Sequence, residues 1–229
     1  MSLSIVLPVG CGQVDVDGAD GGSGAADDGG GIEEVTLSQA NSSAVTGWVT
    51  CGNEAMHTSE SSFYRAFALG DFDIVGSFHI RRVTFGVYRA IAGGGVGSQP
   101  AELKIHKYSG PVGGDALDPS MLTMVSSTAF PIPDVTEPRT IDVRLVADID
   151  GSTSFVVELF VPNGQDEMNL FQAGVNTQGE RAPAYFLAPT CLVSEPTSFN
   201  LVGFPSPDYV LVLSVTGDGR RSAAELGAR

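Results

Sequence analysis

From residue 45 onward the sequence consists of short apolar runs separated by Gly, Pro, Asp and Ser. Short runs between regularly spaced turn residues are typical of a β-sandwich or barrel, whereas parallel crossovers would require helices. The clearest run covers residues 79–90, in which Val83, Phe85 and Val87 alternate with smaller or more polar residues. A period of two places one set of side chains on a buried sheet face. The pattern therefore predicts an all-β, antiparallel sandwich.

The same pattern predicts about nine strands. A hairpin is expected between the runs at 140–148 and 154–161, because Asp150 and Gly151 supply a turn signal between them. The predicted strands lie near residues 45–50, 62–69, 79–90, 101–108, 121–129, 140–148, 154–161, 184–189 and 208–215.

The chain divides into a sandwich domain and flanking segments. Residues 12–44 are predicted to form a disordered, acidic, glycine-rich linker, because they hold too few large apolar side chains to offset the entropy of ordering. The sandwich is expected at residues 45–217, and residues 218–229 are predicted to be a polar C-terminal tail.

Residues 1–11, MSLSIVLPVGC, form a short apolar run that ends in Gly10-Cys11. This run resembles the end of a bacterial lipoprotein signal peptide, in which the cysteine is lipidated after cleavage. The resemblance implies a truncated signal peptide, a lipidated Cys11, and an exported protein that is either an outer-membrane or cell-surface lipoprotein or secreted. A start upstream of Met1 would supply the missing basic segment. The alternative is a frayed hydrophobic tail with a chance cysteine.

The charge of the chain excludes some partners. The formal net charge is −15, and the first Lys or Arg is Arg65, so no cationic arm could neutralise phosphates. We therefore expect no nucleic-acid partner. Because the sequence has no apolar run of spanning length, membrane contact is expected only through an N-terminal lipid anchor.

Several short motifs occur in order between residues 45 and 217. They are TCG at 50–52, SFYRAF at 62–67, VTFGV at 83–87, LKIHKY at 103–108, VVELF at 156–160, FQAGVN at 171–176 and AYFLAP at 184–189. In order and spacing these motifs resemble a jelly-roll-like module of secreted and cell-surface bacterial proteins. The resemblance implies a non-catalytic, jelly-roll-like β-sandwich that serves as an accessory domain, a family without an established ligand or agreed site.

Cys51 and Cys191 are the two cysteines inside the predicted domain. The matching positions in the resembling modules are also cysteines, and an exported protein can keep a disulfide, so a Cys51–Cys191 bridge is expected. Cys11 would then be the odd cysteine, in agreement with lipidation. The alternative is that both domain cysteines are small buried apolar residues.

Two pairs of carboxylates could help to hold a structural calcium ion. Asp71 and Asp73 form one pair, and Asp148 and Asp150 form the other, each on one side of a strand end. The alternative is that each aspartate caps its own turn. No cofactor is required for stability, because a domain of this size can bury a sufficient core.

Two aromatic–arginine pairs are candidates for ligand binding. Tyr64-Arg65 and Tyr88-Arg89 each place a ring that can stack on a sugar beside a guanidinium group. The alternative is that these side chains only pack within the sandwich.

The sequence contains neither G-x-S-x-G nor H-E-x-x-H, and its histidines are far apart, so no enzymatic activity is predicted. The predicted function is a non-catalytic cell-surface module for adhesion or for binding a polysaccharide or surface protein. One alternative is a purely structural surface lipoprotein without a ligand. A second is a small secreted hydrolase with dispersed catalytic residues.

Overall fold

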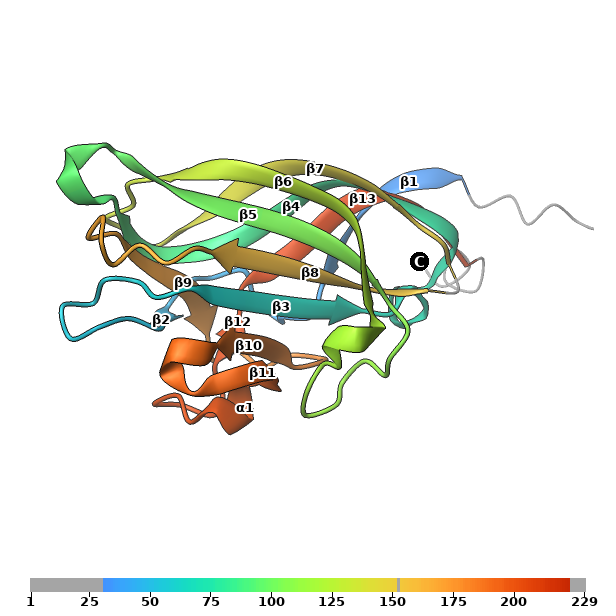
Figure 1. The fold of residues 1–229 in the computed structure, drawn as a ribbon. Helices are drawn as coiled ribbons and strands as arrows, with labels where there is room; N and C mark the ends of the chain where they lie inside the picture. Colours follow the sequence, from blue (N-terminus) through green and yellow to red (C-terminus); the bar gives the residue numbers. More distant parts are fainter. Residues whose placement is uncertain (1–30, 152, 223–229) are drawn as a thin grey trace, which may run out of the picture.

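The computed structural model describes residues 31–151 and 153–222. This part of the chain forms two sheets that pack face to face, and every strand pairing within them is antiparallel (Figure 1). The predicted antiparallel β-sandwich is confirmed. Its short helices are η1 (Leu69–Phe72), η2 (Gly93–Gly95), η3 (Pro119–Met121), η4 (Pro189–Cys191) and α1 (Phe199–Val202).

The first sheet has seven strands and is built around one long strand. Its members are β1 (Ile32–Ser38), β2 (Gly47–Val49), β4 (Ile74–Ile91), β7 (Arg139–Ile149), β9 (Leu170–Asn176), β12 (Val210–Leu211) and β13 (Leu213–Arg221). β4 pairs with β13, β7 and β9. Val83, Phe85 and Val87 of β4 are fully buried, which confirms the predicted alternation.

The second sheet has six strands in the order β11-β10-β3-β8-β5-β6. Its members are β3 (Ser61–Phe67), β5 (Ser98–Tyr108), β6 (Leu122–Pro133), β8 (Ser154–Val161), β10 (Ala184–Ala188) and β11 (Val193–Ser198). All seven residues of β3 are buried, because both of its faces are covered. The inner face meets the core, and on the outer face Leu117, from the β5–β6 connection, joins a small cluster with Tyr64 and Tyr185.

Aromatic rings join the two sheets across the core. Phe67 of β3 stacks on Phe155 of β8, with ring centroids 5.0 Å apart. Phe155 also stacks on Phe78, which belongs to β4 in the opposite sheet. Such ring pairs add to the stabilisation that comes from their buried area.

The expected hairpin between residues 140–148 and 154–161 is wrong. β7 pairs with β4 in the first sheet, whereas β8 pairs with β3 and β5 in the second. The turn therefore carries the chain from one sheet to the other. β8 has five consecutive buried residues, 155–159, because it is an inner strand covered on both faces.

The sandwich extends beyond the predicted limits of 45–217, and within residues 31–151 and 153–222 the structure has thirteen strands rather than about nine. β1 lies in the segment assigned to the linker, and it pairs with β13, which continues to Arg221. Only Val35 and Leu37 of β1 are buried, so its apolar signal is weak. β9 and β11 were also missed, because the apolar residues of β9 do not alternate strictly with polar ones and β11 contains Pro196. No helix in the described ranges is long and apolar enough to cross a membrane.

Candidate functional site

Arg65 is a charged residue in the core of the sandwich. It lies on β3 between Phe63 and Phe67, whose side chains face the opposite sheet. Because side chains two residues apart share a strand face, Arg65 also points inward, and its exposed fraction is 0%. A buried guanidinium requires partners, since an isolated charge in an apolar interior is very costly.

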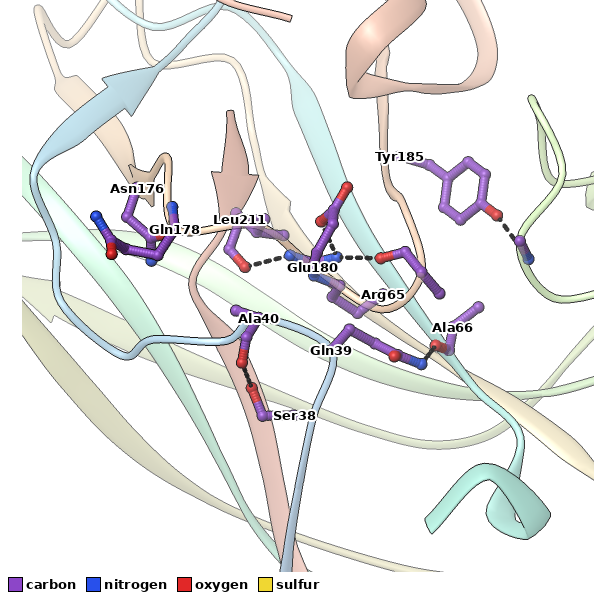
Figure 2. Close-up of polar contacts among 12 residues, drawn as sticks. Ser38, Gln39, Ala40, Arg65, Ala66, Asn176, Gln178, Glu180, Tyr185 and Leu211 are labelled. Carbon is purple, nitrogen blue, oxygen red and sulfur yellow. Dashed lines mark hydrogen bonds and ion pairs between the residues drawn. The ribbon is translucent and has the colours of Figure 1, made fainter. Parts of the chain in front are cut away.

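The partners of Arg65 come from two separate segments (Figure 2). Its Nη1 donates to Glu180 Oε2 over 2.5 Å and to the Ala182 carbonyl over 2.8 Å, and its Nη2 donates to the Leu211 carbonyl over 2.6 Å. Burial lowers the pKa of the guanidinium, and the Glu180 carboxylate opposes that shift. Arg65 thus joins β3 to β12 in the other sheet and to the connection between β9 and β10.

The β9–β10 connection, residues 177–183, is fixed by backbone contacts as well as by Arg65. Arg181 N donates to the Gln39 carbonyl over 2.8 Å, and Asn41 N donates to the Gly179 carbonyl over 3.0 Å. The Gln39 side chain donates in turn to the Ala66 carbonyl on β3 over 2.8 Å (Figure 2). The buried residues Gln39 and Arg65 and the exposed Asn41 therefore all hold this connection in place.

A second connection, residues 109–121, crosses the outer face of the six-stranded sheet. Gly113 N donates to Tyr185 Oη over 3.3 Å, and Ser198 N donates to the Asp115 carbonyl over 2.8 Å. Burial raises the pKa of Tyr185 to about 12. Leu117, within this connection, is buried against the outer face of the sheet and anchors the connection.

The third connection, residues 199–209, begins with α1 and is anchored by aromatic packing. The Phe199 ring packs edge-on against Phe204 and Phe186, with centroids 5.1 and 6.4 Å away. Figure 1 shows β10, β11 and α1 together on one side of the sandwich, near the β5–β6 connection.

A cleft of about 650 Å³ opens between these three connections. Its charged side chains are Asp115, Glu180 and Asp208, which are acidic, and Arg181, which is basic. The Glu180 side chain is 22% exposed, so it contacts both the buried Arg65 and the cleft. The lining residues are Gly113, Gly114, Asp115, Thr177, Gly179, Glu180, Arg181, Ala182, Pro183, Ser198, Asn200, Pro207, Asp208 and Val210.

The structure separates the residues of the first predicted ligand-binding pair. Tyr64 lies on the outer face of the sheet, in the small cluster beneath Leu117, whereas Arg65 lies in the core. Both are buried, so they do not form the expected surface platform. The second pair lies on β4, where Tyr88 is half-buried and Arg89 is exposed.

The four aspartates predicted for calcium do not converge. Asp148 Oδ1 lies 2.6 Å from His79 Nδ1, and Asp150 pairs with Lys107 Nζ over 2.9 Å. Asp71 lies in η1, and Asp73 ends that helix in the left-handed region at φ 59°. In the part of the chain that the structure describes, no three His, Cys, Asp or Glu residues are arranged to hold a metal ion.

The expected bridge between Cys51 and Cys191 is present. It joins the segment that follows β2 to η4, between β10 and β11, and it spans 140 residues of sequence. Cys11 lies outside the described residues.

A polar cluster on the outer face of the six-stranded sheet was not anticipated from the sequence. The Glu158 carboxylate accepts from Ser62 Oγ over 2.8 Å and lies 2.9 Å from His106 Nε2 and 3.2 Å from Lys104 Nζ. Burial acts to raise the pKa of Glu158, but the contacts with His106, Ser62 and Lys104 outweigh it, so the pKa lies below its ordinary value. In a nucleophilic relay the histidine contacts the hydroxyl, whereas here the carboxylate lies between them. The cluster therefore holds a buried charge, and it lacks the histidine–hydroxyl contact of such a relay.

The cleft residues were also missed by sequence reasoning. Arg65 was named, but its partner Glu180 is 115 residues away. The only local signal is the polar run at residues 176–181 between two apolar strands. No protein-family model matches the chain, and no curated protein or solved structure is significantly similar to it.

Proposed function

We propose that the protein is a non-catalytic, exported β-sandwich module that binds an extracellular carbohydrate or protein through the cleft between residues 113–115, 177–183 and 198–210. The observation that carries this proposal is the preorganisation of the cleft. Arg65, Tyr185 and Phe199 are buried side chains that each anchor one of its walls. A rigid, concave site with convergent polar groups is the usual form of a ligand site, because little entropy is lost on binding.

Gly114 offers a direct way to test the cleft. A Cβ atom at this position would meet only the Ala116 carbonyl oxygen, at 3.7 Å, which is an ordinary contact. A Gly114→Trp substitution should therefore fill the cleft without straining the fold. Gly70→Trp is the matched control, because a Cβ atom at Gly70 in η1 meets nothing within 4 Å and Gly70 does not line the cleft.

The test measures binding of the full chain to immobilised cell-wall polysaccharides, oligosaccharides and extracellular proteins. We expect saturable binding by the wild-type protein and by Gly70→Trp, and loss of binding by Gly114→Trp. Equal binding by all three would place the ligand elsewhere and contradict the role of the cleft. No binding by the wild-type protein would instead favour a structural accessory without a ligand.

Export is part of the proposal and has its own support. A Cys51–Cys191 bridge is typical of oxidising compartments, where such bonds persist. We further propose that Cys11 carries the lipid anchor. Bacteria that express the chain from a start upstream of Met1, which would supply the basic segment of the signal peptide, should incorporate a labelled fatty acid into the wild-type protein but not into Cys11→Ser. A wild-type protein that incorporates no labelled fatty acid would contradict the proposal that Cys11 is lipidated.

A further inference from the structure

The cleft combines hydrogen-bond acceptors with donors. Asp115, Glu180 and Asp208 supply carboxylate oxygens, which only accept. Asn200 supplies an amide, which both donates and accepts. The Arg181 guanidinium lies over the Phe72 ring, 5.7 Å from its centroid, and Phe72 does not line the cleft. Thr177 adds a hydroxyl group, whereas the hydroxyl of the buried Ser198 already donates to Asn200 Oδ1 over 2.5 Å. The described lining residues include no aromatic side chain, so hydrogen bonds rather than ring stacking would select the ligand.

Glu180 is the most constrained acceptor in the cleft. Its Oε2 is held by Arg65, whose side chain is fully buried. Figure 2 shows the other carboxylate oxygen directed away from the guanidinium. Because the buried ion pair fixes the carboxylate, this second oxygen is available to a ligand at little further entropic cost.

The charges on the lining limit which ligands can bind. Three carboxylates give the cleft a negative charge, which would repel an anionic ligand. A cationic ligand would match the carboxylates but would leave the N–H groups of the Asn200 amide without acceptors. A sugar hydroxyl both donates and accepts, so it can satisfy every polar group of the lining.

We infer that the ligand of the cleft is a neutral saccharide, whose hydroxyl groups donate to Glu180, Asp115 and Asp208. This inference rests on the proposed function, and it narrows the ligand class from carbohydrate or protein to uncharged glycans. The selection arises from hydrogen-bond matching inside a rigid, negatively charged cleft.

Asp208→Asn and Asp115→Asn test the inference without disturbing Arg65. Both side chains are exposed, and neither makes a side-chain hydrogen bond within the described residues. Loss of a hydrogen bond to a charged acceptor should weaken binding roughly tenfold. Asp166→Asn is the matched control, since it removes the same charge from an exposed residue in the β8–β9 connection, outside the cleft.

The probes are neutral glucans and mannans, a uronic-acid polysaccharide and a lysine-rich peptide, each measured at low and high salt. We expect binding to a neutral glycan that is insensitive to salt, is weakened by both cleft variants and is unchanged in Asp166→Asn. A cleft that instead binds the lysine-rich peptide, with affinity falling as salt rises, would overturn the inference while leaving the proposed function standing. Uronic-acid binding in the cleft would overturn it in the same way.

Two further outcomes separate the inference from the proposed function. Binding of neutral glycans that is unaffected in Asp115→Asn, Asp208→Asn and Gly114→Trp would place the glycan site outside the cleft, and the inference would fail. Absence of binding to every probe and to the broader panel of polysaccharides and proteins would remove the proposed function itself. Circular dichroism of each variant verifies that the fold is retained.

Discussion

Arg65 and Glu180 form an ion pair although they are 115 residues apart in the sequence, with Nη1 and Oε2 2.5 Å from each other. The Arg65 side chain is fully buried and the Glu180 side chain is 22% exposed, so the pair connects the core with the cleft. Because Arg65 also donates to the Leu211 carbonyl, one guanidinium joins both sheets and one wall of the cleft.

Removal of the Glu180 carboxylate should destabilise the fold strongly. Glu180→Ala leaves the Arg65 charge buried without its counter-ion, which typically costs about 3 kcal/mol or more. We expect the free energy of unfolding, measured by urea titration, to fall by that amount.

The exposed ion pair between Lys107 and Asp150 supplies the control. Its side chains are 38% and 73% exposed. Asp150→Ala should therefore change the free energy of unfolding by no more than about 1 kcal/mol. Similar small losses in Glu180→Ala and Asp150→Ala would show that the buried pair has no special role.

The disulfide should contribute substantially to stability. The Cys51–Cys191 bridge closes a long loop of the unfolded chain, with a sequence separation of 140 residues. Reduction should lower the free energy of unfolding by about 2–4 kcal/mol. The double variant Cys51→Ser/Cys191→Ser should start at the lower value and be unaffected by reductant. An unchanged urea midpoint on reduction of the wild-type protein would refute this expectation.

Stability should depend on pH through Glu158. Its pKa is lower in the folded protein than its ordinary value of 4.5, so the unfolded chain binds the proton more tightly. The stabilisation is therefore fully present above pH 4.5 and is lost as the pH falls through the lower, folded pKa. The difference in unfolding free energy between wild type and Glu158→Gln should shrink over that acidic range. Parallel pH profiles for wild type and Glu158→Gln would disprove the assignment.

Close contact between two glycines on adjacent strands should make Gly174 intolerant of a side chain. A Cβ atom there would lie 2.7 Å from the Gly86 carbonyl carbon and 2.8 Å from a methyl group of Val45. Because backbone must shift to relieve this overlap, Gly174→Ala should cost roughly 1–3 kcal/mol. Gly70→Ala, at a position with no atom within 4 Å of a Cβ, should be nearly neutral in the same thermal or urea measurement. Equal stability of the two variants would mean that the backbones of β4 and β9 shift apart at this point without a measurable energetic cost.

The alternation of apolar residues was sufficient to predict the fold class. Val83, Phe85 and Val87 have their predicted burial, because a strand's period of two is a local property of the backbone. Strands with weak apolar signals were not found in this way. β1 buries only Val35 and Leu37, and it is ordered by its pairing with β13 at the far end of the chain.

Among the predicted site residues, too, local sequence patterns predicted less than contacts between distant segments determined. A Cys51–Cys191 disulfide was predictable, because the domain holds only these two cysteines and the resembling modules have cysteines at the matching positions. The structure contains this disulfide. Tyr64 and Arg65 were grouped as a surface platform because they are neighbours in the sequence. Successive residues of a strand point to opposite faces, and coverage of both faces buried them.

The sequence by itself determined the period-two pattern, and hence an antiparallel all-β chain with turns at its Gly, Pro and Asp residues. Only the tertiary structure decided which sheet each strand joined, as the separation of β7 from β8 illustrates. It also decided that Glu180 would neutralise Arg65 and that three connections would enclose a cleft. The physical reason is that alternation fixes which side chains of a strand are buried, whereas pairing partners and buried charges depend on contacts between distant segments.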